Sequence, residues 1–210
     1  MIPFQITQDS LERIRKIDRE MENKTFHYHI HLLYDIRTFL GKDKVTYLEI
    51  GSYAGGSQSL MSSHEYPTNC VSIDLGHPID KNVVVRNVER FSNPQSTFQY
   101  IQGNSHDENI INAVHDNVGE CEILFIDGDH SKVGTIQDFE NYSDLVLPNG
   151  FIIFDDYMDS NHSPEVKTAV DEIVTKLNKE KFNIIGSISY DLLSDFSKHK
   201  SSNLFIIQKL

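Results

Sequence analysis

The sequence is poor in cysteine and in basic residues, and each shortage excludes a class of protein. Only two of its 210 residues are cysteines, Cys70 and Cys121, and their positions give no paired spacing for a zinc site. We therefore expect two reduced thiols in the protein core. Lysine and arginine number 19 against 31 aspartates and glutamates, which gives a net charge of -12. This balance disfavours nucleic acids and anionic membrane surfaces as partners.

Long apolar runs are also absent. No stretch approaches the roughly 20 apolar residues that span a bilayer, and the N-terminal segment lacks the apolar core of a signal peptide. We therefore expect a cytoplasmic protein with no membrane partner. Hydrophobic residues at 39% and charged residues at 24% argue against disorder, and the length suits one α/β domain with a substantial core.

The apolar pattern predicts strands that alternate with helices. Short apolar runs predict strands at residues 45–50, 69–74, 97–102, 121–126, 150–154, 182–188 and 203–210. Helices are expected at residues 57–64, 107–117, 131–145 and 164–180. A turn from Pro148 to Gly150 should precede the fifth strand, and the polar residues 75–95, with two prolines, predict a loop with at most one helical turn.

This order of elements predicts an α/β fold class, a doubly wound, Rossmann-like, seven-stranded sheet that is mostly parallel. No helix separates the last two strands, so we expect the last strand to be antiparallel. Two amphipathic helices, at residues 8–24 and 28–40, predict an N-terminal helical cap. We expect a single domain over residues 1–210, with the cap at 1–42 and a cofactor-binding core at 43–210. The apolar face of residues 28–40 could pack on the sheet or on a second subunit, which leaves a homo-oligomer open.

A glycine-bearing turn, EIGSYAGGS from Glu49 to Ser57, follows the first strand. Glycines at a strand-to-helix turn let the backbone approach a ligand closely, above the N-terminus of a helix. Asp74 ends the next strand, where a carboxylate can accept hydrogen bonds from both hydroxyls of a ribose. Together they predict a cofactor that contains a nucleoside. The turn is not Gly-x-Gly-x-x-Gly, and the Glu49 carboxylate would suit a cationic sulfonium cofactor better than a pyrophosphate.

Acidic residues follow two further strands, at the edge where parallel sheets bind ligands. Asp127-Gly128-Asp129-His130 comes after the run EILFI, and Asp155-Asp156-Tyr157 comes after GFIIF. Asp127, Asp155 and Asp156 could form a hard oxygen site for a divalent cation. His130 titrates in the range that suits a general base, although it could also simply begin the next helix. Asp129 could cap that helix near Ser131.

These motifs resemble the class I S-adenosylmethionine-dependent methyltransferases. LEIGSYAGGS, VSIDLG, EILFIDGDHS and LPNGFIIFDDY are most similar to the metal-dependent O-methyltransferases of macrolide sugars and the cephalosporin-hydroxylase-like branch. The resemblance covers roughly residues 45–160. It implies a cofactor site made of Glu49, Gly51, Ser52, Tyr53, Gly55, Ser57, Asp74, Asn104, Ser105, Asp127 and Gly128. It implies metal ligands at Asp127, Asp155 and Asp156, and a catalytic role for His130. Many relatives have aspartate where this chain has Asn104.

The resemblance agrees with the chemistry that methyl transfer to oxygen requires. A sugar hydroxyl is a weak acid, and Mg²⁺ or another divalent cation would lower its pKa while a nearby histidine takes the proton. We therefore expect a small hydroxylated acceptor, a sugar. Three alternatives stay open from the residues: a metal-independent methyltransferase, a nicotinamide-dependent oxidoreductase and a non-catalytic cofactor-binding protein.

Other histidines near these motifs invite a functional interpretation. His27, His29 and His31 alternate on the second helix of the cap, with no acidic partner evident, so we expect a partly exposed helix surface. Tyr157 and His162 follow the second acidic motif and could contact the substrate. A mobile polar loop is an equally good interpretation of that segment.

Overall fold

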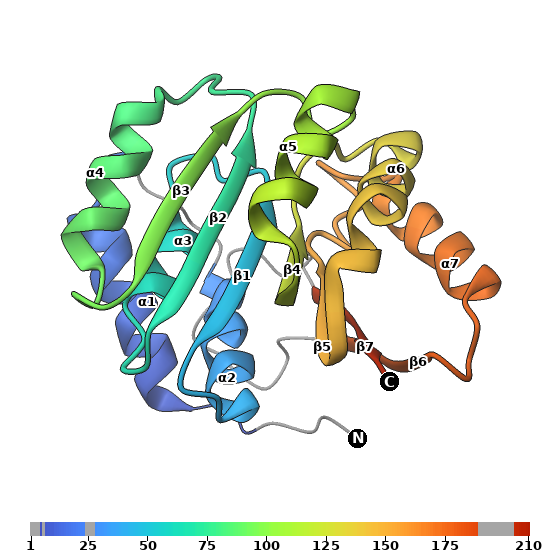
Figure 1. The fold of residues 1–210 in the computed structure, drawn as a ribbon, viewed down its shortest axis with the longest axis horizontal. Helices are drawn as coiled ribbons and strands as arrows, with labels where there is room; N and C mark the ends of the chain where they lie inside the picture. The colour runs from blue at the N-terminus through green and yellow to red at the C-terminus, as the bar shows by residue number, and fades with distance from the viewer. Residues whose placement is uncertain (1–4, 6, 24–27, 189–203) are drawn as a thin grey trace. The chain divides into compact units, whose positions relative to one another are not determined.

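The computed structural model describes residues 5, 7–23, 28–188 and 204–210 (Figure 1). Its α-helices are α1 (Gln8–Glu20), α2 (His31–Leu40), α3 (Gly56–Ser62), α4 (Lys81–Phe91), α5 (Glu108–Val118), α6 (Lys132–Tyr142) and α7 (Val166–Lys176). Two 3-10 helices are η1 (Tyr28–Ile30) and η2 (Ser143–Leu145). The strands are β1 (Val45–Ile50), β2 (Thr68–Asp74), β3 (Thr97–Gln102), β4 (Cys121–Ile126), β5 (Val146–Phe154), β6 (Phe182–Ile188) and β7 (Leu204–Lys209).

The strands form a seven-stranded sheet in the order β3-β2-β1-β4-β5-β7-β6. The pairs β1–β2, β2–β3 and β4–β5 are parallel, whereas β7 pairs antiparallel with both β5 and β6. The predicted Rossmann-like, mostly parallel sheet with an antiparallel last strand is therefore confirmed. Within the described ranges, no helix is long and apolar enough to cross a membrane.

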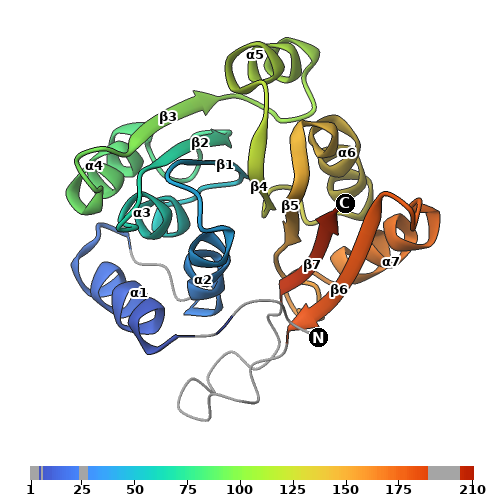
Figure 2. The ribbon, with the colours of Figure 1, turned by 60° about the horizontal axis from the view of Figure 1, so that its bottom comes forward.

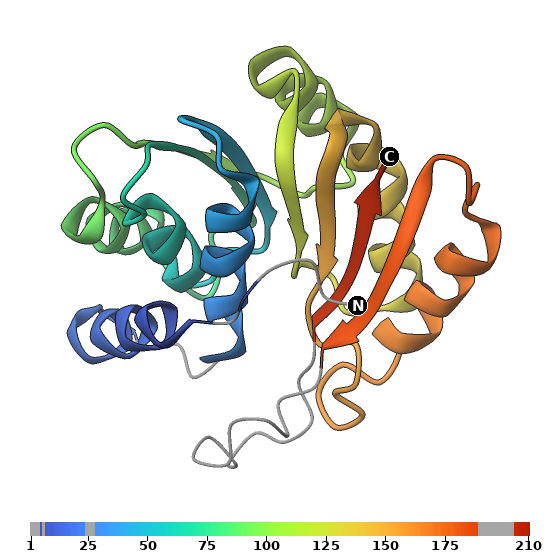
Figure 3. The ribbon, with the colours of Figure 1, turned by 90° about the horizontal axis from the view of Figure 1, so that it is seen from below.

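The chain divides into two compact units, which we call the N-terminal unit (Met1–Asn104) and the C-terminal unit (Ser105–Leu210). In the N-terminal unit, helices α1, α2 and α3 pack against one another, and α3 also packs on α4 and β2 (Figure 2). In the C-terminal unit, α6 and α7 lie together on one side of β4, β5, β7 and β6 (Figure 3). The assignment of residues 1–210 to one domain, with a cap and a core, stays a prediction.

The prediction of a loop over residues 75–95 is wrong, because α4 occupies Lys81–Phe91. The side chain of Asp80 caps its first turn by accepting a hydrogen bond from the backbone N–H of Asn82. Val84 and Val88, spaced one helical turn apart, are fully buried against Tyr100. Both prolines of residues 75–95 lie outside the helix. The helical spacing of Val84 and Val88 was therefore the feature of the sequence that indicated a helix.

Strand β5 begins earlier than predicted. It runs from Val146 and includes the expected turn at Pro148–Gly150 as an irregularity within the strand. The register shifts between Cys121 and Ile123, and Asn149 has a φ of 68°. The turn residues therefore form a bulge that the neighbouring strand accommodates.

Both cysteines are free and fully buried, as expected. The histidines of the cap differ from the prediction. His27 lies outside the described residues, and His29 and His31 are 6% and 0% exposed rather than on a helix surface. Burial lowers the pKa of His31 and favours its neutral form.

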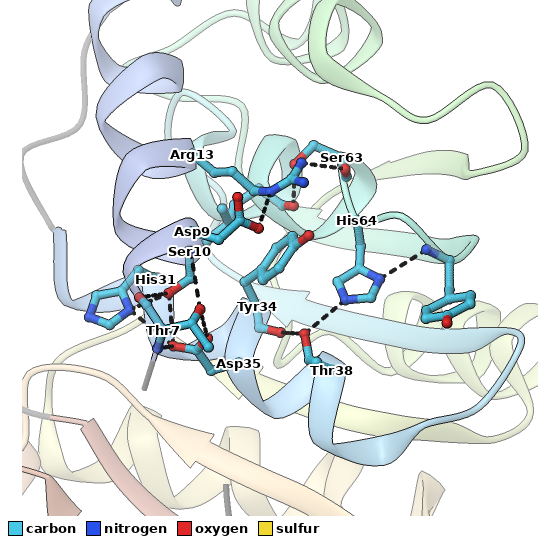
Figure 4. Close-up of polar contacts among 12 residues, drawn as sticks. Thr7, Asp9, Ser10, Arg13, His31, Tyr34, Asp35, Thr38, Ser63 and His64 are labelled. Carbon is cyan, nitrogen blue, oxygen red and sulfur yellow. Dashed lines mark hydrogen bonds and ion pairs between the residues drawn. The ribbon is translucent and has the colours of Figure 1, made fainter. Parts of the chain in front are cut away.

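His31 belongs to a polar cluster that ties α1 to α2 (Figure 4). The carboxylate of Asp35 accepts hydrogen bonds from the hydroxyl groups of Thr7, at 2.6 Å, and Ser10, at 2.8 Å. Ser10 Oγ also lies 3.0 Å from Nδ1 of His31. The acidic partner of His31 is Asp35, one helical turn later in α2. Its second partner, Ser10, lies in α1 and could not be predicted from the sequence pattern of α2.

Candidate active site

The glycine turn after β1 has the backbone geometry that its glycines predict. Gly51 and Gly55 have φ values of 85° and 81°, in the left-handed region that glycine adopts without strain. The N–H of Gly51 donates to the carbonyl of Ile73 at 2.8 Å, which anchors the turn to β2. A Cβ atom at Gly55 would lie 3.0 Å from Cγ1 of Val84, so glycine there also lets α3 approach α4.

The carboxylate of Asp74 organises this turn. Its Oδ2 accepts from the backbone N–H groups of Ser52 and Tyr53, at 2.9 and 3.1 Å. Its Oδ1 accepts from the N–H of Gly76 at 2.7 Å and the hydroxyl of Tyr100 at 3.2 Å. A carboxylate offers about four acceptor positions, so these donors use most of its capacity. The role that the structure shows for Asp74 is to hold the turn, and its predicted contact with ribose stays a prediction.

Glu49 and Ser57 meet beneath the first turn of α3. Both are buried, and the Ser57 hydroxyl donates a hydrogen bond to Oε1 of Glu49. Burial, and then the charge of Glu49, raise the pKa of the neighbouring Tyr47 hydroxyl. The carboxylate of Glu49 thus supports the helix that begins at the glycine turn.

The acidic residues of the C-terminal unit gather at the ends of β4 and β5. Asp155 follows β5 directly, and its N–H donates to the carbonyl of Ile126 at 3.0 Å. Nε2 of His130 lies 3.2 Å from Oδ1 of Asp127, and its Nδ1 lies 3.6 Å from Oδ2 of Asp156. Among the described residues, Asp127, His130 and Asp156 each offer an atom within 4.8 Å of the others, a spacing that a metal ion could bridge.

Asp155 holds a different position from its two predicted co-ligands. Its Oδ1 accepts a hydrogen bond from the N–H of Asp156 at 2.7 Å, and its side chain is not in the group that could bridge a metal. Asp156 itself has a φ of 56°. A non-glycine residue in the left-handed region is a local strain of the kind that gathers at functional sites.

The electrostatics of the cluster follow from this crowding. Hydrogen bonding to Asp127 raises the pKa of His130 to about 9. Burial, followed by the negative charge of Asp155, raises the pKa of the Asp127 carboxyl. A cation near the carboxylates is therefore favoured, and the His130 imidazolium can serve as one.

Ser163 completes the cluster and was not predicted from the sequence. Its side chain is 1% exposed, and Oγ lies 2.6 Å from Oδ2 of Asp156 and 2.8 Å from Nδ1 of His130. No motif marks it, because a serine in a polar loop has no periodicity that distinguishes it. The only available signal was its place eight residues after Asp155, within the same connection.

The segment after the acidic motif makes several hydrogen bonds within its own unit. Asp159 is 5% exposed and accepts from the N–H groups of Asn161 and His162, at 2.9 and 3.0 Å. Its carboxylate also lies 3.0 Å from Nδ1 of His162, whose side chain is 79% exposed. The hydroxyl of Tyr157 donates to Asp171 at 2.7 Å.

The remaining predicted residues lie at the surface or contact their own unit. Asn104 and Gly128 are exposed. The Ser105 hydroxyl donates to Asp138 at 2.6 Å. The position of Ser105 beside the adenine stays a prediction. Asp129 accepts from the N–H of Ser131 at 2.9 Å, but Ser131 itself caps α6.

The sequence matches a family described as "Methyltransferase domain" over residues 48–157, which is more than half of the chain. A relative from Acanthamoeba polyphaga mimivirus, named as an uncharacterized protein, is 34% identical over 208 residues. That similarity covers 95% of this chain and 94% of the relative.

Solved structures share the fold. An O-methyltransferase from Bacillus cereus in complex with SAH has a TM-score of 0.68 at 14% identity and covers 98% of this chain and 92% of that one. MycE, a methyltransferase of the mycinamycin pathway solved with Mg, SAH and mycinamycin VI, has a TM-score of 0.61 at 17% identity, with 95% of this chain covering 54% of MycE. An rRNA methylase from Streptococcus thermophilus has a TM-score of 0.62 at 14% identity, over 87% of this chain and 96% of that one. At these identities the similarity establishes the fold and leaves the acceptor open.

Proposed function

This chain belongs to the methyltransferase-domain family, as a class I S-adenosylmethionine-dependent methyltransferase, and on that premise we propose that it methylates a hydroxyl oxygen of a small acceptor, a sugar, with help from a divalent cation. The observation that carries the proposal is the cluster of Asp127, His130 and Asp156, whose side-chain atoms lie within 4.8 Å of one another. Membership of the methyltransferase family argues against the alternative of a nicotinamide-dependent oxidoreductase.

The N-terminal unit supplies the features that a sulfonium cofactor needs. The turn from Gly51 to Gly55 leads into α3 and leaves only Tyr53 exposed, and Asp74 keeps that turn in one shape. Preorganised backbone costs less entropy when a ligand binds. We propose that this turn, with Glu49 and Ser57 beneath it, holds the methionine part of the cofactor, and that Asn104 and Ser105 lie near the adenine.

The donor set of the acidic cluster fits a divalent cation. Carboxylates are hard ligands that suit Mg²⁺ and Mn²⁺, and an imidazole nitrogen is tolerated by Mn²⁺ and later transition metals. We propose that Asp127 and Asp156 hold the metal and that Asp155 supports it from the adjoining position. A bound cation supplies Lewis acidity that lowers the pKa of the acceptor hydroxyl. The Mg in the MycE structure supports this proposal by analogy of fold.

His130 is the group that we propose takes the proton from the acceptor hydroxyl. Its ring is held on one side by Asp127 and on the other by Ser163, so its orientation is defined before the acceptor binds. The neighbouring carboxylates raise the pKa of His130 and keep the ring protonated, and a cation bound to them would offset their charge and leave the ring neutral, as a base must be. The net charge of -12 supports a small neutral acceptor over a ribosomal RNA.

Calorimetric titration tests the cofactor and the metal separately. Metal-stripped protein is titrated with S-adenosylhomocysteine and, in a second cell, with Mg²⁺ or Mn²⁺. We expect the nucleoside to bind wild type and to bind Asp156→Asn equally well, while the metal binds wild type only. The acceptor is then sought among hydroxylated sugars by the mass gain of one methylene. Failure of S-adenosylhomocysteine to bind wild type would contradict the cofactor site.

A metal-independent methyltransferase is the second candidate, and one observation favours it. The ring of His130 already lies between Asp127 and Asp156, at 3.2 and 3.6 Å, so the histidine can neutralise these carboxylates without a metal. Turnover that survives exhaustive chelation would select this candidate. Turnover that is lost with the chelator and regained with Mg²⁺ or Mn²⁺ would select the metal-assisted one.

A further inference from the structure

One buried hydroxyl connects the two functional halves of the acidic cluster. Ser163 is 1% exposed, and its Oγ lies within hydrogen-bond distance of both Asp156 and His130. Its backbone is also held, because its N–H donates to the carbonyl of Asp159 at 3.1 Å and its carbonyl accepts from Val166 at 3.2 Å. The hydroxyl is therefore fixed in position by the first turns of the segment that leads into α7.

The directions of these two hydrogen bonds follow from their chemistry. A serine hydroxyl has one proton, and a carboxylate oxygen can only accept. At 2.6 Å from Oδ2 of Asp156, the hydroxyl donates to the carboxylate. The contact of 2.8 Å with Nδ1 of His130 must then be an N–H that donates to Oγ. Nε2 lies 3.2 Å from Oδ1 of Asp127, and because a carboxylate oxygen can only accept, this nitrogen donates as well.

We propose that Ser163 is a positioning residue, which fixes the orientation of the His130 ring and of the Asp156 carboxylate through a single hydroxyl group. The proposal rests on the proposed function, since it concerns the groups that would hold the proton and the metal there. Partners that orient a metal ligand and a catalytic ring typically change metal affinity by about 10–100-fold when they are removed.

The test is the divalent-cation affinity of metal-stripped protein with changes at Ser163. We expect Ser163→Ala to bind Mn²⁺ about 10–100-fold more weakly than wild type, because Asp156 loses its donor. Ser163→Thr keeps the hydroxyl and should restore the affinity to within about threefold of wild type. Ser160→Ala is the matched control, since Ser160 is exposed in the same segment and should leave the affinity unchanged.

Binding of S-adenosylhomocysteine to each variant separates this proposal from the proposed function. Equal nucleoside binding in wild type and Ser163→Ala shows that the fold and the cofactor site are intact. If Ser163→Ala then binds Mn²⁺ as wild type does, the proposal is wrong and the proposed function stands. If wild type binds neither ligand, the proposed function fails.

Discussion

Two groups of carboxylates, one in each unit, follow strands of the same sheet and are satisfied in different ways. Asp74 accepts from backbone N–H groups and a tyrosine hydroxyl, all of them neutral donors. Asp127 and Asp156 instead lie on either side of His130, and burial, followed by the negative charge of Asp155, raises the pKa of Asp127. The first arrangement builds a rigid turn, whereas the second favours a cation. An acidic residue at a strand end is therefore structural or chemical according to the charge of its partners.

The histidines of the two units repeat this contrast. His64 in the N-terminal unit is fully buried, accepts at Nδ1 from the N–H of Tyr66, and lies with Nε2 3.0 Å from the hydroxyl of Thr38. Burial, and then the charge of Arg37, lower its pKa to about 4. His130 in the C-terminal unit has carboxylate partners, which raise its pKa. One ring is kept neutral for packing and the other is kept ready to hold a proton.

The largest expected effect tests the catalytic role of the histidine in the acidic cluster. Replacing His130 by glutamine should lower the rate of methyl transfer by about 10²–10⁴-fold, because the acceptor hydroxyl loses its base. Single-turnover transfer to the sugar acceptor measures it. His162→Gln is the control, since that ring is 79% exposed and contacts Asp159. Wild-type rates in His130→Gln would leave the cation or a carboxylate as the only activating group.

The next effect concerns the neutral histidine. The folded pKa of His64, about 4, is below the ordinary value of 6.5, so the unfolded chain takes up a proton first as the pH falls. The contribution of neutral His64 is therefore full above pH 6.5 and is lost between 6.5 and about 4. The loss should reach about 3 kcal/mol in the free energy of unfolding. Urea unfolding across this range measures it.

His64→Gln provides the reference for that titration. Glutamine can still donate to Thr38 and accept from Tyr66, but it does not titrate. Its unfolding free energy should fall less steeply with acid than that of wild type. Parallel pH curves for the two proteins would contradict the assignment of the acid loss to His64.

A smaller effect tests the structural carboxylate. Asp74→Asn keeps the side-chain shape but replaces one acceptor oxygen with an N–H₂ group, which cannot accept from its backbone donors. We expect S-adenosylhomocysteine to bind about 10-fold more weakly, because the glycine turn loses its shape. Asp80→Asn should bind normally, since asparagine is an equally good helix cap at α4. Normal binding by Asp74→Asn would mean that the turn holds without the carboxylate.

The smallest expected effect separates backbone strain from close packing. Gly55 and Gly119 both have positive φ values, 81° and 66°, but only Gly55 has a neighbour that a Cβ would crowd. Gly119→Ala should cost about 1 kcal/mol from strain alone, and Gly55→Ala should cost about 1 kcal/mol more. Thermal unfolding measures the difference. Only Gly55→Ala should also weaken nucleoside binding.

Much of the fold could be predicted because it depends on local patterns. The runs VTYLEI and EILFI predicted buried parallel strands, and the lack of a helical pattern in the sequence between the last two strands predicted an antiparallel last strand. The loop prediction at residues 75–95 was wrong because two prolines outweighed the pair Val84 and Val88. That pair becomes informative only when the helix buries it against Tyr100.

The chemistry of the site divides in the same way. The sequence by itself determined which residue types stand at the strand ends: glycines after β1, Asp74 at the end of β2, and the acidic motifs after β4 and β5. These residues lie at the carboxyl ends of their strands, and the position and order of the strands can be predicted from the hydrophobic periodicity. Family membership followed from the same motifs.

Only the tertiary structure decided how those residues are used. It assigned Asp74 to the glycine turn, moved Asp155 out of the group that could bridge a metal, and brought in Ser163 from a polar segment. It also buried His31 against a partner from α1. The physical reason is common to all of these: a polar side chain takes its role from the donors and charges around it, and those come from residues distant in the chain.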